Sequence, residues 1–171
     1  MTPRSSRAIA FGLEREGGYV LGDPPGSESY RGINRLAHPS LDLWAVLDTR
    51  KPIARGTIFP DLEDRVLAFY RAKYWDEELE AMPEDLALVC FDYWINSGAG
   101  RDRTHELARW LGRQPTPQEV IFNRMAWMAA LVCEGVSKDE KKVEFWTDSL
   151  VGWMRRIQKN LREIRRTKEK R

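Results

Sequence analysis

Residues 83–98 read PEDLALVCFDYWINSG, and this stretch decides the fold. Pro83 suits the first turn of a helix, and Ser97-Gly98 provides a stop. Between them, apolar side chains such as Leu86 and Val89 cover most of the helix circumference. Because a helix that is hydrophobic on all sides is normally buried, the sequence predicts a largely helical fold built around this segment.

On the N-terminal side of this segment, the sequence predicts two helices separated by a lobe of turns. Residues 4–16 have a helical spacing that places Leu13 and Glu16 on one face, and two glycines follow as a stop. Residues 19–59 contain clusters of Gly, Pro, Asp and Ser, which favour turns and short strands. Apolar spacing returns over residues 61–75 and predicts the second helix.

On the C-terminal side, the pattern predicts further helices. A short segment over residues 103–111 precedes a glycine, and Thr116-Pro117-Gln118-Glu119 has the form of a capping box that begins a helix ending near Gly135. Residues 137–140 repeat the capping-box pattern, and apolar residues continue from there at helical spacing into a basic tail. The predicted fold class is therefore α+β, mostly α-helical, with a small loop and short-strand lobe and a helical lobe.

The composition indicates a folded protein without a membrane span. The chain has 171 residues, of which 42% are hydrophobic and 32% charged, and this balance fits one globular domain rather than a disordered chain. No run approaches the roughly 20 apolar residues that span a bilayer. The N-terminal residues become charged before the apolar core of a signal peptide could develop, so we expect no signal peptide.

Cysteine and histidine are too sparse to indicate a metal site. Cys90 and Cys133 both lie in apolar stretches, which is typical of buried, reduced thiols, and a disulfide between them is the alternative. His38 and His105 are isolated, no Cys/His pair has the spacing of a zinc site, and no Gly-rich loop matches a phosphate cradle. We therefore expect neither a metal nor another cofactor.

Positive charge is concentrated at the C-terminal end. The formal net charge is only +2, yet residues 155–171 contain nine Lys/Arg and two Glu. Such asymmetry indicates contact with something anionic, namely nucleic acid, a membrane surface or an acidic wall polymer, and a solvated helix face is the alternative. The rest of the chain is net acidic and has no recognised nucleic-acid-binding motif, so we expect no nucleic acid partner.

Glu16 is the carboxylate whose predicted position suits acid catalysis. It shares a helix face with apolar residues, which removes water from it, and it lies in the last turn, where the helix dipole opposes a negative charge. Both effects favour the protonated acid. Such an acid can give its proton to the leaving oxygen of a glycosidic bond, and the alternative is a helix-end glutamate that simply reaches solvent.

A longer pattern around Glu16 resembles a known family. Glu16-Gly17-Gly18-Tyr19, followed by Asp23-Pro24, residues 26–29 and Gly32-Ile33-Asn34, resembles the N-terminal signature of glycoside hydrolase family 108. That family comprises N-acetylmuramidases found among phage endolysins and bacterial secretion-activator proteins. The likeness continues through RLAHPSLDLWAVL, YRAKYWD and FDYWINSG at residues 35–47, 70–76 and 91–98, and into residues 145–157.

The resemblance implies a lysozyme-like α+β fold over a single domain, residues 1–171. It implies a catalytic glycosidase region at residues 1–90 and, at residues 91–171, a helical region similar to the family's peptidoglycan-binding part. The implied reaction is hydrolysis of the β-1,4 bond between N-acetylmuramic acid and N-acetylglucosamine in bacterial peptidoglycan.

The resemblance also implies catalytic residues. Glu16 matches the family's catalytic glutamate, Asp23 matches the aspartate of the following turn, and Ser29 stands where the family has threonine. A glycosidase also needs a group that stabilises the transition state or activates water, and Asp23 and Glu28 are the nearby carboxylates. We favour Asp23, for which an Asx-turn ahead of Pro24 is the structural alternative, as a turn role is for Ser29.

Four further side chains are candidates for contact with substrate. Tyr19 and Tyr30 flank the proposed active turn, where an aromatic ring can lie against a sugar. Asp92 and Asn96 are four residues apart on the central helix, where they either hydrogen-bond acetamido groups of the substrate or brace the helix from within.

Partners and a compartment follow from the same resemblance. A phage endolysin without a signal peptide stays in the host cytoplasm until a holin lets it reach the periplasm and the cell wall. There the basic C-terminal helix would meet an anionic wall polymer or the outer-membrane surface. Two other function classes are alternatives: a non-catalytic peptidoglycan-binding module, and a nucleic-acid-binding helical protein whose affinity would fall steeply with salt.

Overall fold

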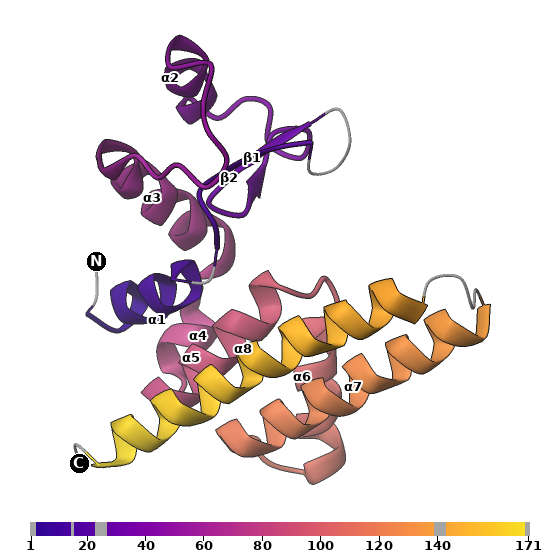
Figure 1. Cartoon of the computed structure of the whole chain (residues 1–171). Helices are drawn as coiled ribbons and strands as arrows, with labels where there is room; N and C mark the ends of the chain where they lie inside the picture. Colours follow the sequence, from indigo (N-terminus) through magenta and orange to yellow (C-terminus); the bar gives the residue numbers. More distant parts are fainter. Residues whose placement is uncertain (1–2, 15, 23–26, 139–142, 170–171) are drawn as a thin grey trace. The chain divides into compact units, whose positions relative to one another are not determined.

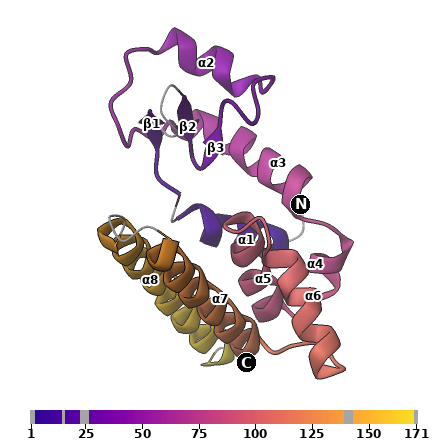
Figure 2. The same ribbon diagram turned by 90° about the vertical axis from the view of Figure 1, so that its right-hand side faces the viewer.

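The structure is a computed structural model that describes residues 3–14, 16–22, 27–138 and 143–169. Figure 1 and Figure 2 show its elements in two views. In chain order they are α1 (Pro3–Leu13), β1 (Tyr19–Leu21), β2 (Glu28–Tyr30), β3 (Ile33–Asn34), α2 (Leu43–Thr49), the 3-10 helix η1 (Pro60–Leu62), α3 (Glu63–Tyr74), α4 (Glu77–Ala81), α5 (Glu84–Ile95), α6 (Gly100–Leu111), α7 (Pro117–Lys138) and α8 (Val143–Glu169). Many helices and one small antiparallel sheet confirm the predicted α+β class.

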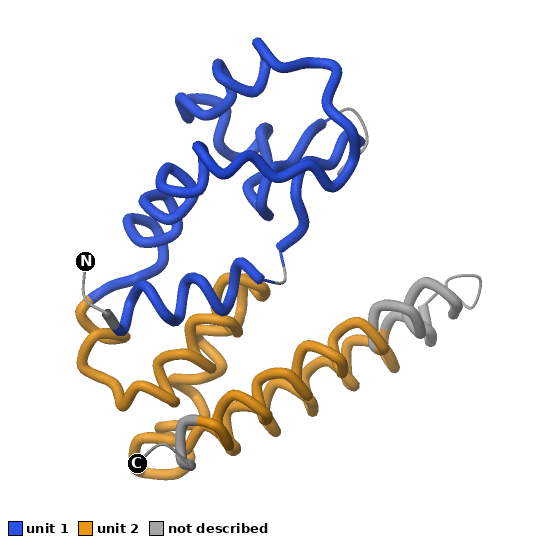
Figure 3. Tube along the Cα trace, turned by 60° about the vertical axis from the view of Figure 1, so that its left-hand side comes forward, with its two compact units in different colours: residues 1–76 blue, residues 77–171 orange. Residues whose placement is uncertain are grey.

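The chain divides into two compact units, residues 1–76 and residues 77–171, which Figure 3 shows in different colours. Among the described residues, the strands all lie in the first unit and the second unit is helical. Residues 90 and 91, between which the sequence analysis divides a catalytic region from a helical region, both lie in α5. Within the described part of the chain, every helix is too short or too polar to cross a bilayer.

The sheet of the first unit is antiparallel in the order β1-β2-β3, with Tyr30 of β2 paired to Tyr19 of β1 and to Ile33 of β3. Only two residues, Arg31 and Gly32, join β2 to β3, and both have positive φ, 50° and 75°. Two-residue turns of this kind match the twist of the flanking strands, and they favour glycine. The predicted lobe of short strands and turns is confirmed, and its tightest turn is Arg31-Gly32.

Helices α1 and α3 pack against each other in the first unit, where Leu13 of α1 and Val66 of α3 are buried. Helix α1 ends at Leu13, earlier than predicted. Sequence analysis missed α2, although its buried residues Leu43, Trp44 and Leu47 have helical spacing. The Gly, Pro and Asp clusters around this short helix favour turns, and they dominate the pattern over the longer window.

Helix α5 is the centre of the second unit. Its side chains from Leu86 to Trp94 are all buried, as the apolar sequence predicts. Helices α6, α7 and α8 pack against it, and α7 and α8 run antiparallel, side by side (Figure 1, Figure 2). Helix α6 ends at Leu111, and the left-handed φ of 66° at Gly112, the next residue, makes Gly112 the predicted stop.

The capping box that begins α7 is confirmed. The Thr116 N–H donates to a carboxylate oxygen of Glu119 over 2.7 Å, and the Glu119 N–H donates to the Thr116 hydroxyl over 3.3 Å. The predicted end of this helix near Gly135 is wrong, because α7 continues to Lys138. The second predicted capping box, at residues 137–140, extends outside the described residues.

Both cysteines are free thiols, so the alternative of a disulfide between them is excluded. Cys90 is buried in α5, and burial raises the pKa of its thiol, which makes it unreactive. Cys133 is exposed on α7, and the prediction that it is buried is wrong. In the apolar stretch before Cys133, Ala129 and Ala130 are also exposed, and Leu131 and Val132 are half-buried.

Candidate active site

Glu16 lies just beyond the end of α1. Its N–H donates to the Leu13 carbonyl over 3.1 Å, which ties Glu16 to the end of the helix, and the side chain is half-buried. The sequence placed Glu16 in the last turn of the helix, whereas the helix ends at Leu13. Glu16 is therefore positioned by the chain that follows it as much as by α1.

The backbone after Glu16 is held by close packing. At Gly18 a Cβ would lie 2.3 Å from the Thr57 carbonyl oxygen, so any side chain there would collide with backbone. The Tyr19 N–H donates to the Thr57 carbonyl over 2.8 Å, and the Gly56 N–H donates to the Tyr19 carbonyl over 2.7 Å. Gly18 does not have positive φ, so this contact, rather than a left-handed helix stop, accounts for the glycine.

The Glu16 carboxyl group lies against the turn between β2 and β3. A Cβ on Gly32 would stand 2.6 Å from the Glu16 Oε2 atom and 2.7 Å from the Tyr70 hydroxyl oxygen. The carboxyl group, the turn and the phenol therefore meet at one point. Glycine is required at position 32 for two reasons. Its φ is 75°, and a side chain would displace Glu16 or Tyr70.

Arg31, the first residue of the turn, connects the parts of this arrangement. Its Nη1 donates to the main-chain carbonyl of Glu16 over 2.7 Å, and its Nη2 donates to the Glu63 carboxylate over 2.9 Å. Its own carbonyl accepts a hydrogen bond from the Tyr70 hydroxyl over 2.8 Å. A planar guanidinium suits a bridge between two acceptors. One turn residue thus ties the end of α1 to two positions on α3.

Two tyrosines of α3 stand beside Glu16. The rings of Tyr70 and Tyr74 stack with their centroids 5.7 Å apart. Burial raises the pKa of the Tyr74 phenol, and the nearby Glu16 carboxyl group adds to the shift, so Tyr74 stays neutral. A half-buried carboxyl group next to aromatic rings can deliver a proton to a bound substrate.

Glu28, the other described carboxylate considered for catalysis, has a different environment. It is 5% exposed, and its carboxylate accepts hydrogen bonds from the Tyr19 hydroxyl over 2.7 Å, from the Lys51 ammonium over 3.0 Å and from the Arg35 guanidinium. Burial acts to raise the pKa of Glu28, but the three donors outweigh it and hold the pKa below its ordinary value. Glu28 is therefore an ionised member of a charge cluster and not a proton donor.

The two tyrosines predicted to contact substrate have buried side chains. The Tyr19 hydroxyl donates to Glu28, and Tyr30, with no exposed surface, accepts the Phe59 N–H at its hydroxyl over 2.9 Å. Both rings fill the core under the sheet and hold the hairpin in place. Solvent reaches neither ring in this structure, and contact with substrate stays a prediction for both residues.

Of the two residues predicted to act with Glu16, the structure describes Ser29 but not Asp23. Ser29 is 8% exposed and accepts a hydrogen bond from the Asn34 side-chain amide over 3.3 Å, across the β2–β3 ladder. This contact matches the structural alternative given for Ser29. Asp23 lies outside the described residues.

Asp92 and Asn96 belong to the second unit. Asp92 is fully buried on α5, and its carboxylate accepts hydrogen bonds from Arg124 over 2.6 Å and from Asn160 over 3.0 Å. The Asn96 amide donates to the Asp92 carbonyl over 2.8 Å. These contacts match the bracing alternative, and the burial of Asp92 keeps its carboxylate from contact with a substrate.

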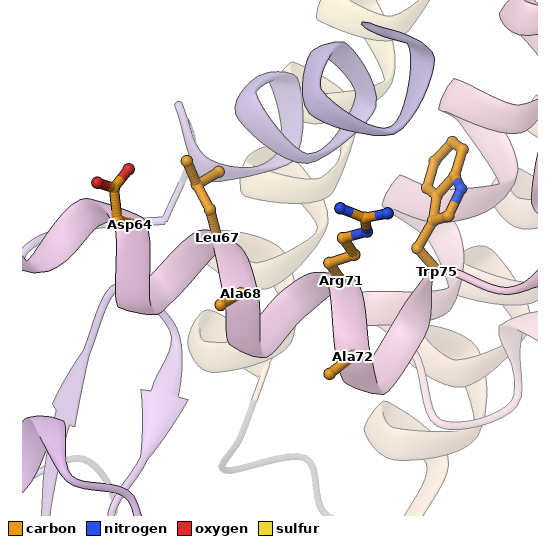
Figure 4. A pocket seen from close by; sticks show the side chains of 6 residues that line it. All are labelled: Asp64, Leu67, Ala68, Arg71, Ala72 and Trp75. Carbon is orange, nitrogen blue, oxygen red and sulfur yellow. The ribbon is translucent and has the colours of Figure 1, made fainter. Parts of the chain in front are cut away.

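Sequence reasoning missed a hollow of about 500 Å³ along α3. It is lined by Asp64, Leu67, Ala68, Arg71, Ala72 and Trp75. Figure 4 shows the side chains of Asp64, Leu67, Arg71 and Trp75 projecting from the same side of the helix. An indole ring with a guanidinium four residues away can hold a sugar, through the ring face and through hydrogen bonds.

The hollow and the tyrosines beside Glu16 belong to the same helix but to different faces of it. Arg71 directly follows Tyr70 in α3, and Trp75 directly follows Tyr74. The signal that could have found the hollow is the spacing of Leu67, Arg71 and Trp75, which recur every fourth residue beside the buried face. Among the described residues, His, Cys, Asp and Glu nowhere gather in a group of three that could hold a metal ion.

The comparison with protein families bears on this site. The model of the family glycosyl hydrolase 108 matches residues 9–98, which is more than half of the chain. The matched range contains Glu16, the Arg31-Gly32 turn and all of α3. Comparison with curated proteins and with solved structures gives no match.

Proposed function

The chain belongs to glycosyl hydrolase family 108 and is a glycoside hydrolase, and from this premise we propose that it is an N-acetylmuramidase. Its proposed substrate is bacterial peptidoglycan, cleaved at the β-1,4 bond between N-acetylmuramic acid and N-acetylglucosamine. The observation that carries the proposal is the position of Glu16, a half-buried carboxyl group held between the Arg31-Gly32 turn and the tyrosines of α3.

In this proposal Glu16 is the general acid. As the bond between the anomeric carbon and the glycosidic oxygen breaks, the Glu16 carboxyl group gives its proton to that oxygen, which leaves as a sugar hydroxyl. Arg31 does not carry a proton in this step. It is a positioning residue, because it fixes the main chain of Glu16 and, through its own carbonyl, the Tyr70 hydroxyl.

A second carboxylate must act on the positive charge that develops at the anomeric carbon. Asp23, which lies between β1 and β2 in the sequence, is the residue that we propose for it. This carboxylate either bonds to the anomeric carbon or takes a proton from the water that adds to it. Glu28 is less suited, because three donors already occupy its oxygens.

The hollow on α3 is the proposed place for part of the glycan. The Trp75 ring would lie against the C–H face of one sugar, and Arg71 would bond its polar substituents. Asp64, about three helical turns from Trp75, would bond a further sugar. In support of this placement, the hollow is formed by the helix that also carries Tyr70 and Tyr74, which stand beside the acid.

The wider setting is proposed from the resemblance in sequence. The protein would act as a phage endolysin in host lysis, kept in the host cytoplasm until a holin gives it access to the wall. Residues 1–90 would carry catalysis, and residues 91–171 would contribute to holding the wall.

The test is to digest purified peptidoglycan with the wild type and to reduce the new sugar ends with borohydride. Muramicitol after hydrolysis identifies an N-acetylmuramidase, whereas glucosaminitol would identify cleavage of the other bond. Glu16→Gln keeps the size and one acceptor but has no proton to donate, and we expect it to lose activity by about a thousandfold or more.

The matched control is Glu14→Gln, which removes a carboxylate from an exposed position two residues away and should keep full activity. Circular dichroism checks that both variants are folded. Equal activity of Glu16→Gln and the wild type would remove Glu16 from the mechanism. A folded wild type that binds peptidoglycan but releases no reducing ends would favour the non-catalytic binding module.

A further inference from the structure

Helix α7 exposes an uncharged, mostly apolar face along successive turns. Between residues 122 and 133 its exposed side chains are Phe122, Ala126, Ala129, Ala130 and Cys133. They recur every three or four residues and therefore lie on one side of the helix. Phe122 is 62% exposed, and the only charged residue in this range, Arg124, is fully buried. A contiguous apolar face of this kind marks an interaction surface.

Helix α8 exposes a basic face. Its exposed cations are Arg155, Lys159, Arg162, Arg165 and Arg166. Their spacing places them opposite the buried residues Ile157 and Ile164. From residue 151 to residue 166 the sequence contains one acidic residue, the half-buried Glu163. Exposed Leu161 and Val151 border the cations.

The two faces belong to one surface. Helices α7 and α8 lie antiparallel and in contact, and both pack against α5 through their buried sides (Figure 2). Their exposed sides consequently face away from α5. We call this surface, formed by the exposed residues 122–133 of α7 and 151–166 of α8, the hairpin face; one of its strips is apolar and the other is basic.

We propose that the hairpin face binds the surface of a bilayer that contains anionic phospholipid. Apolar side chains such as Phe122 would enter the boundary between head groups and acyl chains, and the Arg and Lys side chains would bind lipid phosphates. The helices would lie on the bilayer without crossing it.

Charge and polarity favour this occupant over two others. A soluble anionic wall polymer would engage the basic strip of α8 but would leave the apolar strip of α7 in water. A second copy of the chain, related by a twofold axis, would bring two basic α8 strips towards each other, and like charges repel. A bilayer with anionic lipid uses both strips at once.

The test is co-sedimentation of the full chain with vesicles of phosphatidylethanolamine and phosphatidylglycerol, compared with vesicles of phosphatidylcholine. Binding is expected only to the anionic vesicles and is expected to weaken with salt. Arg155→Gln/Arg162→Gln should lower the affinity about 25-fold, since each cation at an anionic surface contributes about fivefold. Phe122→Ala should lower it about tenfold and leave the salt dependence unchanged.

The matched control is Arg55→Gln/Arg65→Gln, which removes the same charge from exposed positions of the first unit and should bind as the wild type does. All substituted residues are exposed, and circular dichroism verifies the folds. Equal losses in the two double variants would overturn the proposal, because net charge and not the hairpin face would then govern binding.

Two other results would also overturn it. One is binding to purified teichoic acid without binding to vesicles, which would assign the basic strip to a wall polymer. The other is a dimer in analytical ultracentrifugation that Phe122→Ala abolishes, again without vesicle binding, which would assign the surface to a second copy. None of these readouts needs hydrolysis, so they are independent of the proposed muramidase activity.

Discussion

Each unit of the molecule buries an arginine next to a carboxylate, but the two arginines have different roles. In the second unit, Arg124 and Asp92 bond over 2.6 Å with side chains 1% and 0% exposed. In the first unit, the Arg31 and Glu63 side chains bond over 2.9 Å and are 10% and 29% exposed. Arg31 also donates to the main-chain carbonyl of Glu16.

The two arginine charges act at different places in the molecule. Arg124 compensates a carboxylate that water cannot reach, in a network with Asn160 that joins α5, α7 and α8. Arg31 sits in a turn with positive φ and holds backbone beside the proposed acid. Loss of Arg124 should therefore lower mainly the free energy of unfolding, and loss of Arg31 should lower mainly the catalytic rate.

Arg124→Met is expected to have the largest effect on stability. It leaves the Asp92 carboxylate buried without its cation, and breaking a buried pair in this way costs about 3–5 kcal/mol. Urea unfolding of the variant and the wild type, followed by circular dichroism, measures the difference. A loss below about 1 kcal/mol would mean that Asp92 is not held as a buried charge.

The double variant Asp92→Leu/Arg124→Met is the control for this interpretation. It removes both charges, and the Asn160 amide is left without its carboxylate acceptor, which costs about 1–2 kcal/mol. The double variant should therefore be more stable than Arg124→Met alone. If it is less stable, packing rather than charge explains the single variant.

Gly32→Ala tests the first unit at the point where Glu16, the turn and Tyr70 meet. The φ of 75° alone costs an alanine about 1–2 kcal/mol, and the added methyl group would stand 2.6 Å from Glu16 Oε2. A misplaced acid should reduce kcat/KM about a hundredfold. Reducing-end release from peptidoglycan measures it.

Gly56→Ala is the matched control in the same unit. Gly56 has φ of 82°, but a Cβ there would meet no atom within 4 Å. The Gly56→Ala variant should lose a similar free energy of unfolding, because its backbone also has positive φ, and it should keep its activity. Equal losses of activity in the two variants would show that the strain in the backbone, and not the contact with Glu16, lowers catalysis.

The fold was predictable where it depends on local patterns. The apolar circumference of residues 84–95 predicts a buried helix, and the Thr116 and Glu119 pair predicts where α7 begins, because each signal lies within a few turns of chain. Glu16 was found from its helix face and from the resemblance. The exposed face of α7 was not predicted, because the apolar pattern around Cys133 resembles that of a core helix.

The rest of the site was not predictable, because it depends on contacts between distant parts of the chain. Arg31 meets Glu16 and Glu63 only after the hairpin and α3 are in place. Likewise, nothing near Asp92 in the sequence shows that Arg124 and Asn160 will neutralise it. A one-dimensional pattern identifies polar residues on an apolar helix, but it cannot distinguish a buried partner from a substrate.

Glu28→Gln tests the other carboxylate of the first unit, Glu28, which the fold holds ionised, in contrast to the proposed acid Glu16. Its pKa is lower in the folded chain than in the unfolded chain, so its contribution is present above the ordinary glutamate pKa and is lost as pH falls through the folded value. The variant should lose about 2 kcal/mol at neutral pH. Urea unfolding at neutral and at acid pH should show the difference from the wild type shrinking in acid, and a difference independent of pH would contradict it.

Arg31→Lys should have the smallest effect and separates positioning from binding. An ammonium on a flexible chain can hold the Glu16 carbonyl or the Glu63 carboxylate but not both in the fixed geometry of a guanidinium. Because Arg31 acts on the main chain of Glu16, kcat should fall about tenfold while KM stays nearly unchanged. Glu63→Gln keeps an acceptor for Arg31, so kcat should fall less in this variant than in Arg31→Lys. A raised KM with unchanged kcat would instead indicate that the Arg31 side chain contacts substrate. Arg31 would then bind the glycan, whereas Arg124 only compensates a buried carboxylate.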